Sequence, residues 1–231
     1  MSSVSAAAPN SHWPYPRFIA HRGGGTLAPE NTLAGFREAR HFCFQGIETD
    51  VMLTADGAAV LSHDPVLGRV VKSASPVASL SLKEIKTLDA GSLTAQKWAG
   101  ERIPTLEEAI ETCEANGLFM NIEIKPASES AAQATAQETV RIVKKLFEGK
   151  SLPLLSSFSR NALAAAAVEA PEIPRGLLLE GIPTDWKEVC MKLAVKTVHP
   201  DWQSVTPDFV EEAHTMGLGV MCYTVDSPDT A

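Results

Sequence analysis

The chain of 231 residues is 45% hydrophobic, enough for one sizeable core, and barrels of this length commonly stay undivided. Its net charge of −8 and pI near 5.3 exclude a general nucleic-acid binder, which needs a basic face. The sequence contains no run near the ~20 apolar residues of a membrane span, and no signal peptide is visible. Four widely spaced cysteines indicate buried thiols in a reducing compartment. We therefore expect a cytoplasmic protein without nucleic acid and without membrane insertion, and the charge balance leaves a small phosphorylated substrate open.

The first ordered segment is expected to be a strand that leads into a glycine run. The apolar residues 18–20 predict the strand, and His21, Arg22 and three glycines follow it. Consecutive glycines allow backbone N–H groups to approach an anion. The next segment, TLAGFREARHF, has apolar residues at helical spacing, with Asn31 as the expected N-cap.

Residues 45–53 predict a second strand, and the Asp-Gly pair after it predicts a hairpin returning along 58–62. Glu48 and Asp50 lie two apart, so strand alternation directs both side chains to one face. Adjacent carboxylates repel one another unless a cation lies between them, and a divalent ion with oxygen ligands suits such a pair. The two residues are predicted to be half of a metal site, with a solvated strand face as the alternative.

Residues 66–102 have a weak pattern, with one short helix expected after Ser79 or Ser81. Long connections of this kind often cover a pocket, so we interpret the segment as a small cap insertion. A capping box of Thr105 and Glu108 then predicts a helix that ends near 116.

The rest of the chain alternates between strand and helix patterns. The segments are 118–125, 128–147, 152–158, 161–170, 175–180, 184–193, 197–201, 207–216 and 218–225. This alternation predicts an α/β fold, a (β/α)8 TIM-type barrel over 16–231 preceded by a disordered tail over 1–15. The chain stops soon after the last strand, so we expect a truncated C-terminus.

Several polar residues follow apolar runs, at the strand ends where parallel α/β folds collect their chemistry. His21 and His63 are two of them, although a histidine is more often structural. Arg22 offers a planar fork for a phosphate. Glu123 and Lys125 end a central strand, where charge is costly unless it is used; a simple ion pair is the alternative.

The motifs HRG, PENT, E-x-D, HD and E-x-K, in this order, resemble those of the glycerophosphodiester phosphodiesterase family. The resemblance covers 13–226, and longer matches such as NIEIKP and PLLSSF resemble the bacterial cytosolic members linked to glycerol phosphate uptake. It implies a PLC-like phosphodiesterase barrel and a divalent metal ion, Mg²⁺ or Ca²⁺. It also implies hydrolysis of diesters such as glycerophosphocholine and glycerophosphoethanolamine to sn-glycerol 3-phosphate and an alcohol.

The resemblance also implies roles for single residues. These are an acid/base pair (His21, His63), metal ligands (Glu48, Asp50, Glu123), phosphate-binding cations (Arg22, Lys125) and pocket positions (Glu30, Asn31, Ser157, Tyr223). The chain departs from the family at Asp226, where an Asn is usual, and in the closing segment. A related barrel lyase that forms a cyclic phosphate, and a catalytically dead barrel that binds phosphate ligands, are the alternatives. The sequence leaves five questions open: which head group is preferred, whether the metal is Mg²⁺ or Ca²⁺, which histidine is the acid, whether water attacks directly, and whether the protein is a homo-oligomer.

Overall fold

A curved sheet forms the centre of the computed structural model, which describes residues 13–227 and 229. Within these residues the sheet has seven strands in the order β2-β1-β3-β4-β5-β6-β7. Only the β1–β2 pair is antiparallel among them. The strands are β1 Gly46–Leu53, β2 Ala59–Leu61, β3 Phe119–Ile124, β4 Leu154–Ser157, β5 Arg175–Leu179, β6 Thr197–Pro200 and β7 Gly219–Val220.

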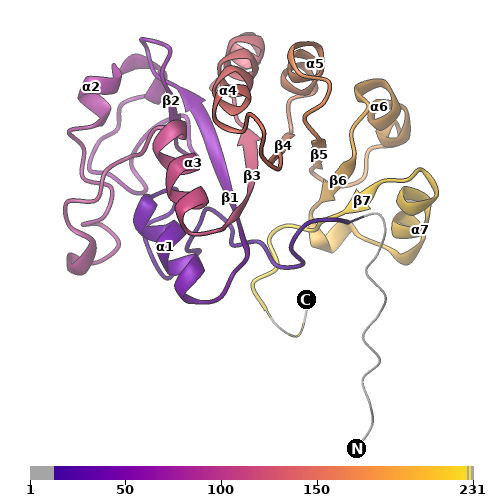
Figure 1. Ribbon diagram of the computed structural model, residues 1–231, viewed down its shortest axis with the longest axis horizontal. Coiled ribbons are helices and arrows are strands. Elements are labelled where there is room, and N and C mark those ends of the chain that lie inside the picture. The colour runs from indigo at the N-terminus through magenta and orange to yellow at the C-terminus, as the bar shows by residue number, and fades with distance from the viewer. Residues whose placement is uncertain (1–12, 228, 230–231) are drawn as a thin grey trace, which may run out of the picture.

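Helices cover the convex side of this sheet (Figure 1). The α-helices are α1 Leu33–His41, α2 Leu82–Ile85, α3 Leu106–Ala115, α4 Ala132–Leu146, α5 Arg160–Glu169, α6 Trp186–Leu193 and α7 Pro207–Thr215. Short 3-10 turns are η1 Val77–Ser79, η2 Gln96–Trp98, η3 Glu129–Ala131 and η4 Trp202–Ser204. The α/β barrel fold predicted from the sequence is confirmed.

Local sequence signals explain where several elements begin and turn. The Thr105 hydroxyl accepts from the Glu108 N–H while the Glu108 carboxylate accepts from the Thr105 N–H, so the predicted capping box is present. Ser81 caps α2 in the same way. Gly57 takes a φ of +79° in the hairpin between β1 and β2, as the Asp-Gly pair predicted.

Two predicted elements differ from the observed ones. The strand expected over 18–20 is reduced to one parallel bridge between Ala20 and Ile47. The strand expected over 218–225 is β7 alone, followed by a separate bridge between Asp201 and Tyr223. Apolar composition marked both segments correctly, but the number of paired residues depends on neighbours distant in sequence.

The buried apolar side chains of the described residues form three clusters. The first packs α1, α3 and α4 against β1, β3 and β4, and the second packs α6 and α7 against β5 and β6. The third belongs to the segment between β2 and α3, where Val71, Val77 and Ile85 pack beneath Met52 and Val60. This segment therefore has its own small core, which includes Met52 near the C-terminal end of β1 and Val60 of the antiparallel β2.

The segment before Ala20 crosses the N-terminal ends of the strands, drawn in indigo in Figure 1. Tyr15 stacks on Phe119 of β3 at 4.8 Å between ring centroids, and Trp13 meets His199 of β6 edge-on at 6.2 Å. The tail expected over 1–15 lies mostly outside the described residues.

No helix in the described part of the chain is long and apolar enough to cross a membrane. Cys113 and Cys190 are buried, as expected. The prediction was wrong for Cys43, which is exposed, because it lies at a φ of +64° in the turn after α1 rather than on the buried face of that helix.

Candidate active site

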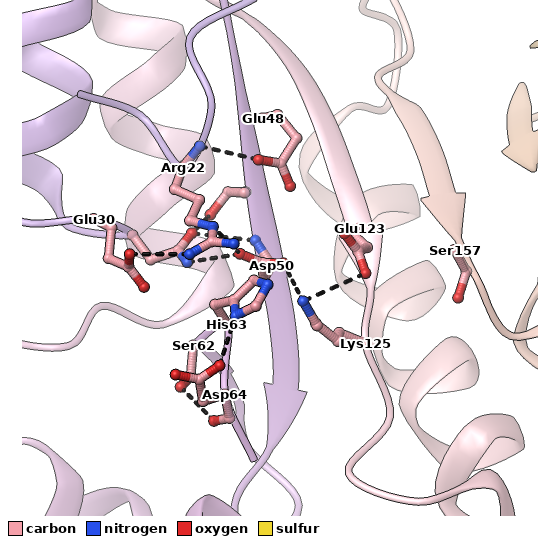
Figure 2. Close-up of polar contacts among 12 residues, drawn as sticks. Arg22, Glu30, Glu48, Asp50, Ser62, His63, Asp64, Glu123, Lys125 and Ser157 are labelled. Carbon is pink, nitrogen blue, oxygen red and sulfur yellow. Dashed lines mark hydrogen bonds and ion pairs between the residues drawn. The ribbon is translucent and has the colours of Figure 1, made fainter. Parts of the chain in front are cut away.

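Three carboxylates meet where β1 and β3 lie side by side. The parallel register places Asp50 opposite Glu123 and Glu48 opposite Asn121. One oxygen from each of Glu48, Asp50 and Glu123 lies within 4.8 Å of the others. Strand alternation brought the first two to one face, as their spacing predicted, and Figure 2 shows Glu123 facing them from the neighbouring strand.

The environment of this trio disfavours three negative charges. Burial, then repulsion by Asp50 and Glu123, raises the pKa of Glu48 well above its usual range. Burial and the Asp50 charge raise the pKa of Glu123 to about 8. Oε1 of Glu48 is buried and has no hydrogen-bond partner among the described residues. Carboxylate oxygens gathered in this way, one of them unpartnered, fit a hard divalent cation.

Lys125 and Arg22 supply the positive charge beside the trio. Lys125 Nζ lies 3.2 Å from Oδ1 of Asp50 and 3.8 Å from Oε1 of Glu123 (Figure 2). The Arg22 backbone N–H donates to Glu48 Oε2 at 3.0 Å. The Arg22 guanidinium lies 3.1 Å from Glu30 and 3.9 Å from Asp50. Both cations are fixed by carboxylates yet remain at the edge of the cluster.

The glycine run forms the tight turn that places Arg22 here. Gly23 has a φ of +85°, and a Cβ there would lie 2.6 Å from the Phe36 ring, so only glycine fits. The expectation that these backbone N–H groups approach an anion is wrong for two of them. Gly23 donates to the Ala20 carbonyl and Gly25 to the His21 carbonyl, because the turn closes on itself.

Asn31 is not the N-cap of α1, which corrects the prediction; Thr32 takes that place. Asn31 has a φ of +53° and is 4% exposed. Its Nδ2 donates to Asp50 Oδ2 at 2.8 Å, while its Oδ1 accepts from the Thr49 hydroxyl and the Asp50 N–H. The side chain thus turns inward and orients Asp50 toward the trio.

The two predicted histidines flank the trio from different elements. His21 follows Ala20, with Nε2 3.9 Å from Glu48 Oε2, and burial followed by the Arg22 charge lowers its pKa to about 4. His63 follows β2, and burial lowers its pKa as well. Both rings are therefore neutral at pH 7, a form that can accept a proton on one nitrogen and donate a hydrogen bond from the other.

The structure places Ser157 and Tyr223 against backbone rather than in the cluster. The Ser157 hydroxyl donates to the Ile124 carbonyl at 2.6 Å, and Figure 2 shows it apart from the carboxylates. The Tyr223 hydroxyl donates to the Leu179 carbonyl at 2.8 Å, and its ring meets Phe158 edge-on. Their expected place in the pocket stays a prediction.

Sequence reasoning assigned no part to Asp64 or Arg69. Asp64 Oδ1 lies 2.7 Å from Nδ1 of His63. Arg69 reaches the same ring and also Glu30. The HD motif could have indicated a role for Asp64. Arg69 lies in the segment 66–102, whose sequence pattern is weak, and only its contacts in the folded protein indicate a role.

Comparisons with known proteins agree on one family. The model of the glycerophosphoryl diester phosphodiesterase family matches residues 21–231. A glycerophosphodiester phosphodiesterase of Caldanaerobacter subterraneus subsp. tengcongensis is 34% identical over 209 residues, which cover 90% of this chain and 85% of the relative.

Solved structures have the same fold. A phosphodiesterase of Oleispira antarctica, in complex with the product sn-glycerol-3-phosphate, superposes with a TM-score of 0.90 at 35% identity, over 94% of this chain and 87% of that one. A glycerophosphodiester phosphodiesterase of Agrobacterium tumefaciens, at 24% identity, TM-score 0.75 and coverage of 92% and 88%, shares the fold.

Proposed function

The chain belongs to the glycerophosphoryl diester phosphodiesterase family, and we propose that it uses a divalent metal ion to hydrolyse glycerophosphodiesters. Glycerophosphocholine and glycerophosphoethanolamine are the proposed substrates, and sn-glycerol 3-phosphate and an alcohol are the products. The observation that carries the proposal is the trio of Glu48, Asp50 and Glu123 flanked by two neutral histidines. The Oleispira relative, solved with sn-glycerol-3-phosphate, supports the product.

The proposed metal ligands are the three carboxylates. The pKa values of Glu48 and Glu123 are raised, and Oε1 of Glu48 has no partner among the described residues. Both features are expected of a cation site when no positive ion balances its carboxylates. Held by these three carboxylates, a divalent ion would polarise a phosphoryl oxygen and lower the pKa of an attacking hydroxyl group. Oxygen ligands accept either Mg²⁺ or Ca²⁺.

His21 and His63 are the proposed acid/base pair. One ring, neutral at pH 7, takes the proton of the attacking hydroxyl group, and the other must first carry a second proton, which it then gives to the leaving alkoxide. Arg22 and Lys125 offset the negative charge that grows on the phosphoryl oxygens. Glu30 holds Arg22, and Asn31 holds Asp50.

The test is release of glycerol 3-phosphate from both diesters in the presence of Mg²⁺, Ca²⁺ or EDTA. We expect release with a metal ion and none with EDTA. His21→Ala and His63→Ala should each lower kcat by about 10²-fold or more, whereas His41→Ala, on the exposed end of α1, should leave it unchanged. Wild-type turnover in either histidine variant, or full activity in EDTA, would contradict the proposal.

The same reaction run in ¹⁸O-labelled water identifies the attacking group. Direct attack by water gives labelled glycerol 3-phosphate at once, whereas attack by the glycerol hydroxyl group first gives a cyclic phosphate visible by ³¹P NMR. The cytoplasmic location and the link to glycerol phosphate uptake stay predictions from the sequence.

A further inference from the structure

Arg69 and Asp64, from the segment between β2 and α3, both contact the proposed catalytic histidine His63. Nη2 of Arg69 lies 2.6 Å from Nδ1 of His63, 2.9 Å from Oδ2 of Asp64 and 3.3 Å from Oε1 of Glu30. Two buried neighbours anchor the Arg69 backbone: Leu67 is 4% exposed and Val71 is 1% exposed. The guanidinium is therefore held in place by the small core of its own segment.

Arg69 Nη2 cannot donate a hydrogen bond to all three of these neighbours at once. A guanidinium nitrogen of this kind has two N–H groups, and arginine cannot accept a hydrogen bond. The positive guanidinium is attracted more strongly by the full negative charges of Asp64 and Glu30 than by a neutral ring nitrogen. The 2.6 Å contact of Arg69 Nη2 and the 2.7 Å contact of Asp64 Oδ1 with Nδ1 of His63 exclude one another as hydrogen bonds, because the first needs an unprotonated Nδ1 and the second a protonated one. We infer that the second forms, with Arg69 held by its ion pairs to Asp64 and Glu30.

Asp64 then decides where His63 carries its proton. Asp64 Oδ1 lies 2.7 Å from Nδ1 of His63, and a carboxylate can only accept, so this bond requires the proton to be on Nδ1. The Ser62 hydroxyl donates to the Asp64 backbone carbonyl at 3.0 Å, which fixes the backbone of the pair. Nε2 is left with a free lone pair, as a general base requires.

We propose that Arg69 is a positioning residue for His63: it holds the Asp64 carboxylate against Nδ1, so that Nε2 is the atom that exchanges protons with the substrate. Without Arg69, the Asp64 side chain, which is 41% exposed, turns to water and leaves Nδ1 unpaired. Glu30 bridges Arg69 to Arg22, so the same guanidinium also steadies the proposed phosphate-binding cation. This inference rests on the proposed function only for the catalytic use of His63.

The test is ¹⁵N NMR of protein labelled at histidine, at pH 7.5, with the His63 signals assigned by their loss in His63→Gln. We expect the Nδ1–H tautomer in the wild type. Asp64→Asn, whose amide can donate to Nδ1, should convert His63 to the Nε2–H tautomer. Arg69→Gln should shift the ratio in the same direction. The matched control is Arg160→Gln, which breaks an exposed Arg–Asp pair of similar exposure on α5 and should change nothing.

An Nε2–H tautomer in the wild type would overturn the inference, because Arg69 would then donate directly to Nδ1. An unchanged tautomer in Arg69→Gln would overturn it too. Both results are obtained without turnover, so they leave the proposed hydrolysis, tested by product release from the wild type, untouched. Kinetics add a second criterion: Arg69→Gln should lower kcat about tenfold to a hundredfold with KM unchanged. A raised KM at unchanged kcat would instead make Arg69 a substrate contact.

Discussion

The raised pKa of Glu123 predicts that the metal-free protein loses stability as the pH rises. The pKa is about 8 in the folded protein against a usual value of 4.5, so near neutral pH the folded state binds a proton that the unfolded state has released. The free energy of unfolding then falls by about 1.4 kcal/mol per pH unit, and the loss flattens as the pH reaches the folded value. Between pH 6.5 and 8 this amounts to about 1.6 kcal/mol.

The choice of pH window matters because histidines act in the opposite direction. Burial lowers the pKa values of His21 and His199 to about 4 and about 3, so their contribution to stability is lost as the pH falls below 6.5. At pH 6.5 these histidines are still half protonated in the unfolded state, so each raises the free energy of unfolding by about 0.4 kcal/mol between pH 6.5 and 8, a contribution that the wild type shares with Glu123→Gln. Within the window, Glu48, whose pKa is also raised, adds to the slope of Glu123 with the same sign.

The assay is urea unfolding in EDTA at pH 6.5, 7, 7.5 and 8, for the wild type and for Glu123→Gln. The variant keeps the shape of the side chain and removes its proton equilibrium, so its slope should be shallower by about 1 kcal/mol per pH unit or more. Glu114→Gln, which changes an exposed carboxylate paired with Lys150, is the control and should keep the wild-type slope. Equal slopes in wild type and Glu123→Gln would refute the reasoning.

Three further predictions follow from the same geometry. Affinity for Mg²⁺, measured by calorimetry, should rise as the pH approaches 8, because binding displaces the Glu123 proton; pH-independent binding would place the ion elsewhere. Asn31→Ala should lower the free energy of unfolding by about 2 kcal/mol or more and weaken metal binding, because three hydrogen bonds to the Thr49 and Asp50 positions are lost. Thr105→Ala should lower it by about 1 kcal/mol with unchanged kcat, and an altered kcat would show that α3 contributes to the site.

The sequence predicted most of the elements because their signals are local. Apolar periodicity, the Asp-Gly turn and the capping box of α3 each act within a few residues, and the structure has all of them. The alternation of Glu48 and Asp50 is of the same kind, since a period of two fixes the face of a strand.

The errors have tertiary causes. By its position in the sequence Asn31 could cap a helix, but its side chain donates to the buried Asp50 carboxylate instead. Thr32 is the N-cap of α1. Arg69 gave no local signal, since its partners come from β2 and from the turn before α1. Cys43 looked apolar by its neighbours, yet the end of α1 exposes it. For Asn31 and Arg69, contacts between segments distant along the chain outweighed a local preference, whereas for Cys43 the cause is the local turn after α1.

The segment before Ala20, which crosses the N-terminal ends of the strands, affects how the chain folds during synthesis. Trp13 and Tyr15 leave the ribosome first, but the rings they pack against, Phe119 and His199, belong to β3 and β6 and are made much later. Apart from their edge-on contact with one another, these two aromatic side chains therefore lack their native neighbours while most of the barrel is translated. Such exposed aromatic surface is what chaperones bind and what promotes aggregation. We therefore expect a slow last folding step, in which Trp13 and Tyr15 pack against the strands of an already formed sheet.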